Sequence, residues 1–373
     1  MNEQIRKDFP ITESCIYLDT AYISPQPYQV LRAGFDFAQR RSAGVAGRVP
    51  EWVDKSEIVK GKLASLLNVK PQTLAFTTNT SDGTNLVANL LDMQEGENVI
   101  WEDLEYPSNK LIWLKNAERL GFENRVVMSI DGSIDIKSIE EKIDKNTRVI
   151  TVSYVTHGNG FRHDIRAICE MAHAHDVYVH VDAIQAVGSF EIDLIADGVD
   201  FLTCGFYKWL LGPKGLAFFY IREGLLDHFE PYQFGWMQVQ NFQGNRLGQG
   251  ETFYQTARKF QTATLHFQGI YEIDAALDYL FSVGMQEIEE QVLVLGQYLY
   301  SGLKDLGIQL LTPEKNRSGI VSCQVPDGIA AEALFNNRQV VAKVTGNEIR
   351  FSPNFFNTLE EIEVVLDLMS SLK

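Results

Sequence analysis

The amine of Lys208 lies in the segment CGFYKWLLGPKG (204–215), between an apolar run and a loop. Its sequence neighbours are large and apolar: Phe206, Tyr207, Trp209 and Leu210. An amine must be neutral to attack a carbonyl, and burial among such side chains lowers the pKa of lysine toward that state. The segment therefore favours an imine-forming lysine. The alternative for a single lysine is a solvated position in a loop.

Asp182 ends a second apolar run, VYVHVDAIQA (177–186). A carboxylate at the end of a strand can pair with a pyridinium nitrogen and keep that ring protonated, so that the ring accepts electrons. The alternative is a capping role at a turn or a helix, which is common for aspartate.

Two further segments place polar or aromatic side chains after expected strands. Thr80 and Ser81, in TTNTSDGTN (77–85), precede an expected helix, where hydroxyls and amides can bind a phosphate. Tyr106, in LEYPSN (104–109), is placed to stack on an aromatic ring. Each has an ordinary alternative, a helix cap or simple packing. No single feature is decisive, but the order and spacing of all four are more specific than any one of them. An imine-forming amine, a partner for a pyridinium nitrogen, a phosphate site and a stacking ring are the groups that pyridoxal 5'-phosphate (PLP) would require.

Short apolar runs alternate with helical segments through the first two thirds of the chain. Several runs are continuously apolar, as expected when both faces of a sheet are covered, and the alternation favours a mostly parallel sheet flanked by helices. Ligands of such sheets bind at the carboxyl ends of the strands. Strands are expected at 73–77, 97–103, 124–130, 147–155, 177–183, 200–206 and 215–222, and helices at 108–121, 133–143 and 165–176.

The length of 373 residues exceeds what one core normally holds, so two domains are expected. Residues 1–18 are expected to form an N-terminal arm and residues 19–255 a large PLP-binding α/β domain. Beyond about Thr256 long helical patterns and short strands take over, so residues 256–373 are expected to form a smaller C-terminal α+β domain.

Composition excludes several other classes of protein. The net charge of -16 disfavours nucleic acid and membrane surfaces as partners. The four cysteines are far apart and form no CxxC pair, so neither a metal site nor a disulfide framework is expected. No apolar signal segment or run of 18 apolar residues is present, and a cytoplasmic location is expected.

The chain resembles the class V aminotransferase and cysteine desulfurase group of fold-type I PLP enzymes. The resemblance runs from IYLDTAYISPQP (16–27) to EIRFSPNFFNTLEEIEVVLDL (348–368), and its most specific part is YKWLLGPKG (207–215) downstream of HVDAIQA (180–186). It implies a fold-type I PLP-transferase architecture. The position of the lysine in that group implies that Lys208 forms the imine with PLP.

Residue by residue, the resemblance implies further cofactor contacts. Asp182 matches the aspartate at the pyridine nitrogen, and Gln185 the glutamine that approaches the ring hydroxyl. Thr80 and Ser81 match the phosphate-binding pair.

Three positions depart from the pattern of the group. Tyr106 stands where a ring-stacking histidine is common, and its aromatic face can still stack. His157, in SYVTHGNGF, falls where desulfurases carry an asparagine near the ring hydroxyl. Tyr207 replaces the histidine that commonly precedes the lysine and touches the phosphate. All three are therefore expected to contact the cofactor.

The resemblance also implies a subunit partner and a substrate contact. Thr264, in ARKFQTATLHFQGI (257–270), matches a threonine that reaches the phosphate of the neighbouring subunit, although Ala263 stands where the group has glycine. A homodimer with shared active sites follows from that match. Arg350 matches the arginine that binds the substrate α-carboxylate through bidentate contacts.

The N-terminal segment adds Ala21 and Tyr22 as substrate-binding candidates. The loop at 234–246 adds Trp236 and Arg246 as weaker ones, since a loop rich in aromatic residues can cover a site or simply pack.

The resemblance leaves the reaction open. Persulfide-forming desulfurases need a mobile cysteine in the loop before the arginine, and residues 338–350 contain none. Cys204 is close to Lys208 in sequence but is expected to be a buried strand residue.

The sequence thus resembles the cysteine-less branch, with its cystine C–S lyases, isopenicillin-N-epimerase-like proteins and kynureninase-like enzymes. We expect C–S (β) elimination from a small L-amino acid through an external aldimine. The alternatives are an aminotransferase or epimerase, or a non-catalytic PLP-binding dimer.

Overall fold

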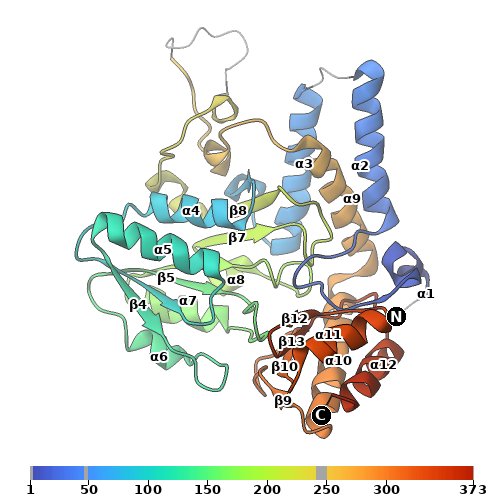
Figure 1. The fold of residues 1–373 in the computed structure, drawn as a ribbon. Coiled ribbons are helices and arrows are strands. Elements are labelled where there is room, and N and C mark those ends of the chain that lie inside the picture. The colour runs from blue at the N-terminus through green and yellow to red at the C-terminus, as the bar shows by residue number, and fades with distance from the viewer. Residues whose placement is uncertain (1–2, 46–48, 241–249, 373) are drawn as a thin grey trace.

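A seven-stranded sheet forms the centre of the molecule in the computed structural model, which describes residues 3–45, 49–240 and 250–372 (Figure 1). The strand order is β2-β8-β7-β6-β5-β3-β4, and the neighbours from β7 to β4 run parallel, whereas β8 is antiparallel to both β7 and β2. The expected mostly parallel α/β sheet is therefore confirmed. The strands are β2 (Leu74–Thr77), β3 (Asn98–Glu102), β4 (Glu123–Val127), β5 (Thr147–Ser153), β6 (Tyr178–Asp182), β7 (Phe201–Gly205) and β8 (Ala217–Ile221).

Both faces of the sheet are covered, which explains the continuous apolar runs. Successive side chains of a strand point to opposite faces, so Phe201 and Phe219 pack in one apolar cluster, while Leu202 and Phe218 pack in another. Helices α4 (Thr80–Leu90) and α5 (Pro107–Leu120) supply the first cluster, and α3 (Val49–Leu67), α7 (Ile165–His173) and α9 (Phe267–Val283) the second. Short helices α6 (Ile136–Glu140) and α8 (Leu194–Asp197) complete this layer.

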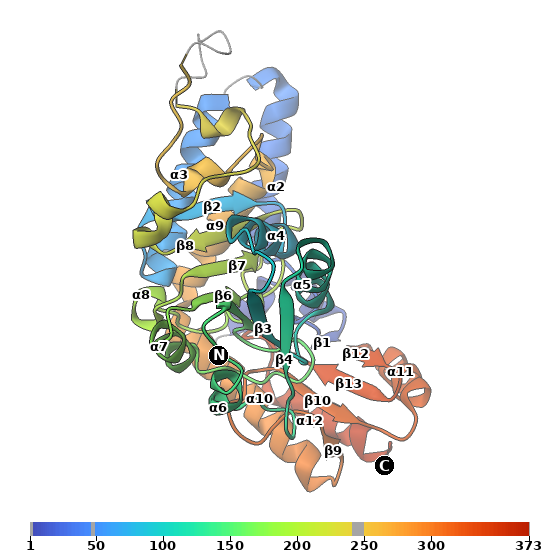
Figure 2. The ribbon, with the colours of Figure 1, turned by 90° about the vertical axis from the view of Figure 1, so that its left-hand side faces the viewer.

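A second, smaller unit lies beside the sheet and is built on an antiparallel sheet of order β12-β13-β10-β9 (Figure 2). Its strands are β9 (Gln309–Leu310), β10 (Val321–Gln324), β12 (Lys343–Thr345) and β13 (Glu348–Phe351), and its helices are α10 (Met285–Asp305), α11 (Gly328–Asn337) and α12 (Leu359–Ser370). The N-terminal strand β1 (Ile16–Tyr17) joins this unit by pairing in parallel with β11 (Val340–Val341).

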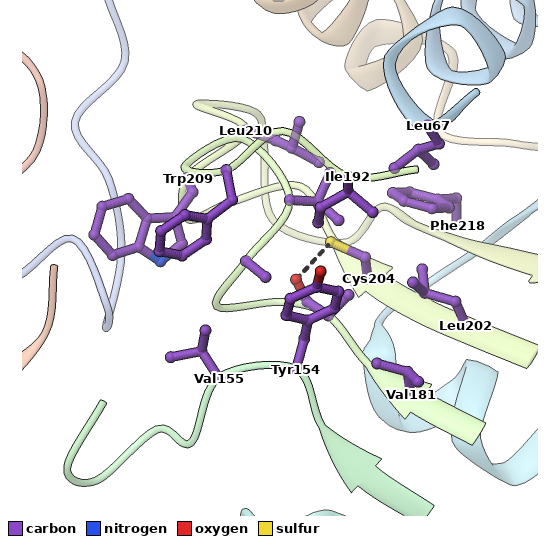
Figure 3. Packing of buried hydrophobic residues seen from close by; sticks show 14 of the residues in the cluster. Leu67, Tyr154, Val155, Val181, Ile192, Leu202, Cys204, Trp209, Leu210 and Phe218 are labelled. Carbon is purple, nitrogen blue, oxygen red and sulfur yellow. Dashed lines mark hydrogen bonds between the residues drawn. The ribbon is translucent and has the colours of Figure 1, made fainter. Parts of the chain in front are cut away.

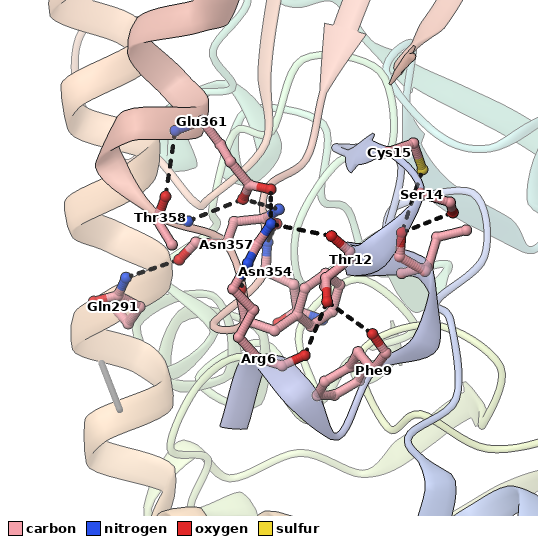
Figure 4. Close-up of polar contacts among 12 residues, drawn as sticks. Arg6, Phe9, Thr12, Ser14, Cys15, Gln291, Asn354, Asn357, Thr358 and Glu361 are labelled. Atoms are coloured by element: carbon pink, nitrogen blue, oxygen red, sulfur yellow. Dashed lines mark hydrogen bonds and ion pairs between the residues drawn. The ribbon is translucent and has the colours of Figure 1, made fainter. Parts of the chain in front are cut away.

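The N-terminal arm, with α1 (Glu3–Lys7) and a short 3-10 helix (Pro10–Glu13), is fixed to the end of the chain. Arg6 forms a 2.7 Å ion pair with Glu361 on α12 and hydrogen-bonds the carbonyl of Phe356 (Figure 4). Asn357 donates to the same Glu361 carboxylate at 2.9 Å. The arm therefore closes over the C-terminal segment.

Helix α9 packs against α2 (Tyr28–Arg40) and α3, and its buried residues belong to the core of the large unit. The residues of α10, from Leu295 onward, belong instead to the core of the second unit. Ile288 and Val292, in the first half of α10, still pack in the core of the large unit. We therefore propose a boundary within α10, before Leu295, rather than at residue 256, with β1 as an N-terminal contribution to the smaller unit.

None of the helices in the described part of the chain combines the length and the apolar character needed to cross a bilayer.

Gly188 offers a test of how tightly the loop of Lys208 is packed. Its φ is +97°, and a Cβ there would lie 2.5 Å from the carbonyl oxygen of Trp209, next to Lys208. Gly215 has a similar φ of +77° with open space around its Cβ position. We expect Gly215→Ala to lose about 1 kcal/mol of unfolding free energy and Gly188→Ala roughly 3 kcal/mol, because only the second adds a backbone clash. Urea unfolding measures both, and equal losses would contradict the packing described.

Candidate active site

The polar side chains predicted from the sequence meet at one edge of the large sheet. Asp182 ends β6, and Lys208 follows β7, the neighbouring strand. Ser153 ends β5 and Glu102 ends β3, the next two strands in the sheet. Because parallel strands end at the same edge, this edge gathers groups that are far apart in the chain.

Lys208 is buried, with 7% of its surface exposed. No described residue forms a hydrogen bond or ion pair with its Nζ, which lies 5.9 Å from the centre of the Tyr207 ring. Burial lowers the pKa of this amine to about 8, although the nearby charge of Asp182 acts in the opposite direction. The amine is therefore close to the neutral state that attack on a carbonyl requires.

Asp182 is held by donors on both of its oxygens. Asn109 Nδ2 donates to Oδ2 at 2.9 Å, and the backbone N–H of Ile184 donates to Oδ1 at 3.0 Å. Burial raises the pKa of this carboxyl, and the two hydrogen bonds and Lys208 oppose that rise. The carboxylate is thus oriented by fixed groups and lies close enough to Lys208 for their charges to interact.

Two more acids lie behind Asp182. Glu105 accepts hydrogen bonds from Asn109 Nδ2 at 2.9 Å and from Ser153 Oγ at 3.0 Å. Glu102 Oε2 lies 2.8 Å from His163 Nε2. Burial, with the charge of Glu102 second, raises the pKa of Glu105. Asn109 therefore links two buried carboxyl groups through one amide.

A hydroxyl group without a hydrogen-bond partner among the described residues lies at the start of α4. The helix cap is Asn79, whose side chain accepts the N–H of Asp82 at 2.8 Å, so neither Thr80 nor Ser81 acts as the cap. Thr80 Oγ1 is buried and has no hydrogen-bond partner among the described residues. A Cβ on Gly205 would lie 3.2 Å from this oxygen and 3.3 Å from Tyr207 Cε1. Such a hydroxyl beside a helix N-terminus and a glycine can accept a close anion.

Tyr106 and His157 form an aromatic wall. Their ring centroids are 5.0 Å apart with an interplanar angle of 90°. Tyr106 is 47% exposed, which leaves ring surface open for stacking. Burial, followed by the charges of Arg350 and Lys208, lowers the pKa of His157 to about 4, so its imidazole is neutral at pH 7. His157 Nδ1 is buried without a partner among the described residues.

Arg350, on β13, brings the second unit into the site. Its guanidinium donates to the carbonyl of His157 at 2.8 Å and to Asp19 Oδ1 at 3.2 Å. Its Nε is buried and unpartnered in the described part of the chain. The guanidinium is thus held in place on both sides while one of its N–H groups is not used.

Gln185 uses its side-chain amide to brace the site. It donates to the carbonyl of Ala21 and accepts from Trp209 Nε1, both at 2.9 Å. Ala21 is buried, whereas Tyr22 is 57% exposed. Gln185 thus connects the N-terminal segment to the loop that carries Lys208.

The remaining candidates lie at the periphery. Thr264 is exposed and lines a cavity of about 330 Å³ together with Thr77 and Thr78, just before α4. Trp236 begins a short 3-10 helix (Trp236–Gln238). Arg246 lies outside the described residues.

Cys204 is a buried core residue, as its strand position suggested. Its Sγ lies among Leu202, Phe218 and Tyr154, within 3.7 Å of the Ala183 carbonyl (Figure 3). Burial raises the pKa of this thiol well above its usual range. It therefore lacks the thiolate character that a nucleophile needs.

Among the residues that the structure places here and that sequence reasoning missed are Asp19, Glu105 and Asn109. Asp19 and Glu105 stand beside residues that were considered, and Asn109 follows Tyr106 by three positions, within the first turn of a helix. The available signal was their polar character in otherwise apolar surroundings. What could not be read was that distant strands would bury them together.

The sequence matches a known protein family over most of its length. The sequence model of the family "Aminotransferase class-V" matches residues 16–362. The chain is 28% identical to a probable cysteine desulfurase of Methanothermobacter thermautotrophicus over 99% of this chain and 98% of that protein. It is also 28% identical to an uncharacterized aminotransferase of Bacillus subtilis, over 98% and 96% of the two chains.

Solved structures share the whole fold. The apo cysteine desulfurase of Thermococcus onnurineus superposes with a TM-score of 0.91 at 26% identity, covering 100% of this chain and 98% of that one. A cystine C–S lyase, solved with its reaction product cysteine persulfide, gives a TM-score of 0.90 at 21% identity, covering 98% and 99%. Fold and cofactor chemistry together define a fold-type I PLP-dependent enzyme. Within that class, the chain belongs to the class V aminotransferase family.

Removing the buried amine should stabilise the cofactor-free protein. Burial lowers the pKa of Lys208 from 10.5 to about 8, so at pH 7 folding buries a charge that the unfolded chain exposes. Between pH 8 and pH 10.5 the unfolded chain binds more protons, and the stability of the wild type should rise with pH. Lys208→Met should gain about 3 kcal/mol at pH 7 and lack that rise. Urea unfolding against pH measures both, and a destabilised variant at pH 7 would contradict the expected burial cost.

Proposed function

We propose that this enzyme acts on a small L-amino acid by C–S (β) elimination and uses no persulfide-forming cysteine. The observation that carries the cofactor chemistry of the proposal is the buried amine of Lys208, which has no hydrogen-bond or ion-pair partner among the described residues and lies near the carboxylate of Asp182. An amine in that state is reactive toward a carbonyl. Proteins rarely bury a lysine without a partner for stability alone.

The residues present fit the cofactor at three points. The unpartnered hydroxyl of Thr80, with Ser81 and the amides at the start of α4, suits the phosphate. Asp182 suits the ring nitrogen, and a pyridinium N–H there would counter the rise in pKa that burial causes. His157 Nδ1 and the amide of Gln185 suit the ring hydroxyl.

PLP, when bound, supplies an electron sink for a bond at the substrate Cα. Arg350 holds the α-carboxylate through charge-assisted hydrogen bonds, and Asp19 and the His157 carbonyl fix its guanidinium. Lys208, with a pKa of about 8, is suited to accept the Cα proton and to return it. The exposed ring face of Tyr106, which is in contact with His157, would stack on the cofactor ring.

The cysteines support elimination over a persulfide mechanism. Cys169, Cys204 and Cys323 are buried and Cys15 is half-buried, and burial raises the pKa of each thiol. Residues 338–350 form β11, β12 and the start of β13, and they carry no cysteine. A sulfur-bearing leaving group would therefore depart without transfer to the protein.

We also propose a two-fold dimer in which Thr264 reaches the phosphate of the neighbouring subunit. Its side chain is exposed, which leaves it available to a partner.

Covalent attachment of the cofactor gives a direct test. Borohydride reduction of the PLP-incubated protein should leave a reduced adduct on Lys208, and Lys208→Ala should lower turnover by at least about a thousandfold. Lys214→Ala is the matched control, because Lys214 is exposed in the same loop. An adduct on another lysine, found by peptide mass spectrometry, would sink the assignment.

Product analysis tests the reaction. We expect L-cysteine or L-cystine to release pyruvate and ammonia, at a rate unchanged after alkylation of accessible thiols with iodoacetamide, because no cysteine takes part. Loss of activity on alkylation would point to a persulfide mechanism. Transfer of the amino group to 2-oxo acids, without pyruvate release, would favour an aminotransferase instead.

A further inference from the structure

A second cation lies on the same sheet face as Arg350. In the antiparallel pair of β12 and β13, Lys343 is directly opposite Arg350, and Thr345 is opposite Glu348. Opposed residues of a sheet have Cα atoms roughly 5 Å apart and send their side chains to the same face. Lys343 therefore extends from the face that carries the carboxylate-binding arginine.

That face is turned toward the space between the two units. Glu348, two residues from Arg350 and on the same face of β13, lines a cavity of about 630 Å³. His157 and Glu105, from the large unit, line the same cavity. Side chains of this face consequently border the candidate active site.

The ammonium of Lys343 is held near the site without being neutralised. Its Nζ lies 5.5 Å from the centre of the Tyr22 ring, an attractive contact for a cation, and Tyr22 is 57% exposed. Lys343 is itself exposed and forms no ion pair with any described residue. Its charge acts on a residue inside the site: burial raises the pKa of Asp19, and the charge of Lys343 opposes that rise.

Arg350 and Lys343 differ in how their charges are balanced. The guanidinium of Arg350 is already matched by Asp19 at 3.2 Å. Once an α-carboxylate occupies Arg350, the charge of Lys343 is still available. The protein as a whole has a net charge of -16, so a cation without an ion-pair partner among the described residues gives this position a local positive charge.

We propose that Lys343, supported by Tyr22, binds a second anionic group on the side chain of the amino-acid substrate. The preferred substrates are then L-amino acids with an acidic side chain, or thioether and disulfide amino acids with a carboxylate beyond the sulfur. This inference rests on the proposed function, because it assumes that Arg350 holds the α-carboxylate.

Two pairs of amino acids of matched shape test the proposal with the holoenzyme: L-aspartate against L-asparagine, and L-glutamate against L-glutamine. The apparent dissociation constant of each is measured from the change in cofactor absorbance, and the shift of the thermal unfolding midpoint gives a second readout. At least one acid should bind about tenfold more tightly than its amide.

Three variants localise that preference. Lys343→Gln should abolish it by weakening only the acid, and Lys343→Arg should retain it. Lys145→Gln is the control for the change in net charge, because Lys145 is exposed in the turn before β5, at the opposite end of the sheet from the site. This control variant should leave the apparent dissociation constants of each acid and its amide unchanged.

Two results would overturn the inference alone: equal binding of acids and amides by the wild type, or a preference that persists in Lys343→Gln. Failure of the imine chemistry on which the proposed function depends gives a different result, since no amino acid would then change the cofactor spectrum, and both proposals would fall. Failure of C–S elimination alone would appear as the absence of pyruvate release from L-cystine while the preference for acids remains.

Discussion

The rest of this structure depends on the burial of one amine beside one carboxylate. Taking Lys208 and Asp182 out of water is costly, and their mutual attraction offsets only part of that cost. The pKa values of the two groups move in the directions that burial dictates, down for the lysine and up for the aspartate. The fold maintains this arrangement because a large sheet, covered on both faces, holds both residues at adjacent strand ends.

Behind that pair, a network of polar side chains limits where each group can move. The amide of Asn109 divides its donors between Asp182 and Glu105, and Thr84 donates to its oxygen at 3.4 Å. A buried network of this kind is stabilising only when most of its members are satisfied. Here Glu102 and Glu105 each keep one unpartnered oxygen among the described residues, and Asn109 supplies one of the two hydrogen bonds that Glu105 accepts.

The fold could be predicted from the sequence where a local pattern of residues determines a strand or a helix. Continuous apolar runs predicted the strands from β3 to β8, and the helix expected at 108–121 corresponds to α5, which ends at Leu120 before Gly121 adopts a left-handed φ of 82°. The reversal of β8 was not predictable, because a short apolar run has no direction. The packing of α9 into the large unit was also hidden, since a helix after a long loop can join either core.

The candidate site also contains some residues that the sequence predicted and others that it did not. Lys208 and Asp182 stand out because charged residues interrupt apolar strand ends. Asp19 does not, because its importance comes from Arg350 on a strand near the other end of the chain. Asn109 reads as an ordinary helix residue until β3, β5 and β6 are placed side by side. Contacts between distant segments, rather than residue type, decide these roles.

The pairing of β1 with β11 has a consequence for how the protein is made. One partner leaves the ribosome among the first residues and the other among the last. This separate two-stranded sheet therefore cannot form until synthesis is nearly finished, and contacts of such long range form slowly. During that interval the first strand keeps an unpaired edge and the apolar Leu18 lacks its final packing. The amino end of the nascent chain is therefore open to mispairing until residues 340–341 have been synthesised.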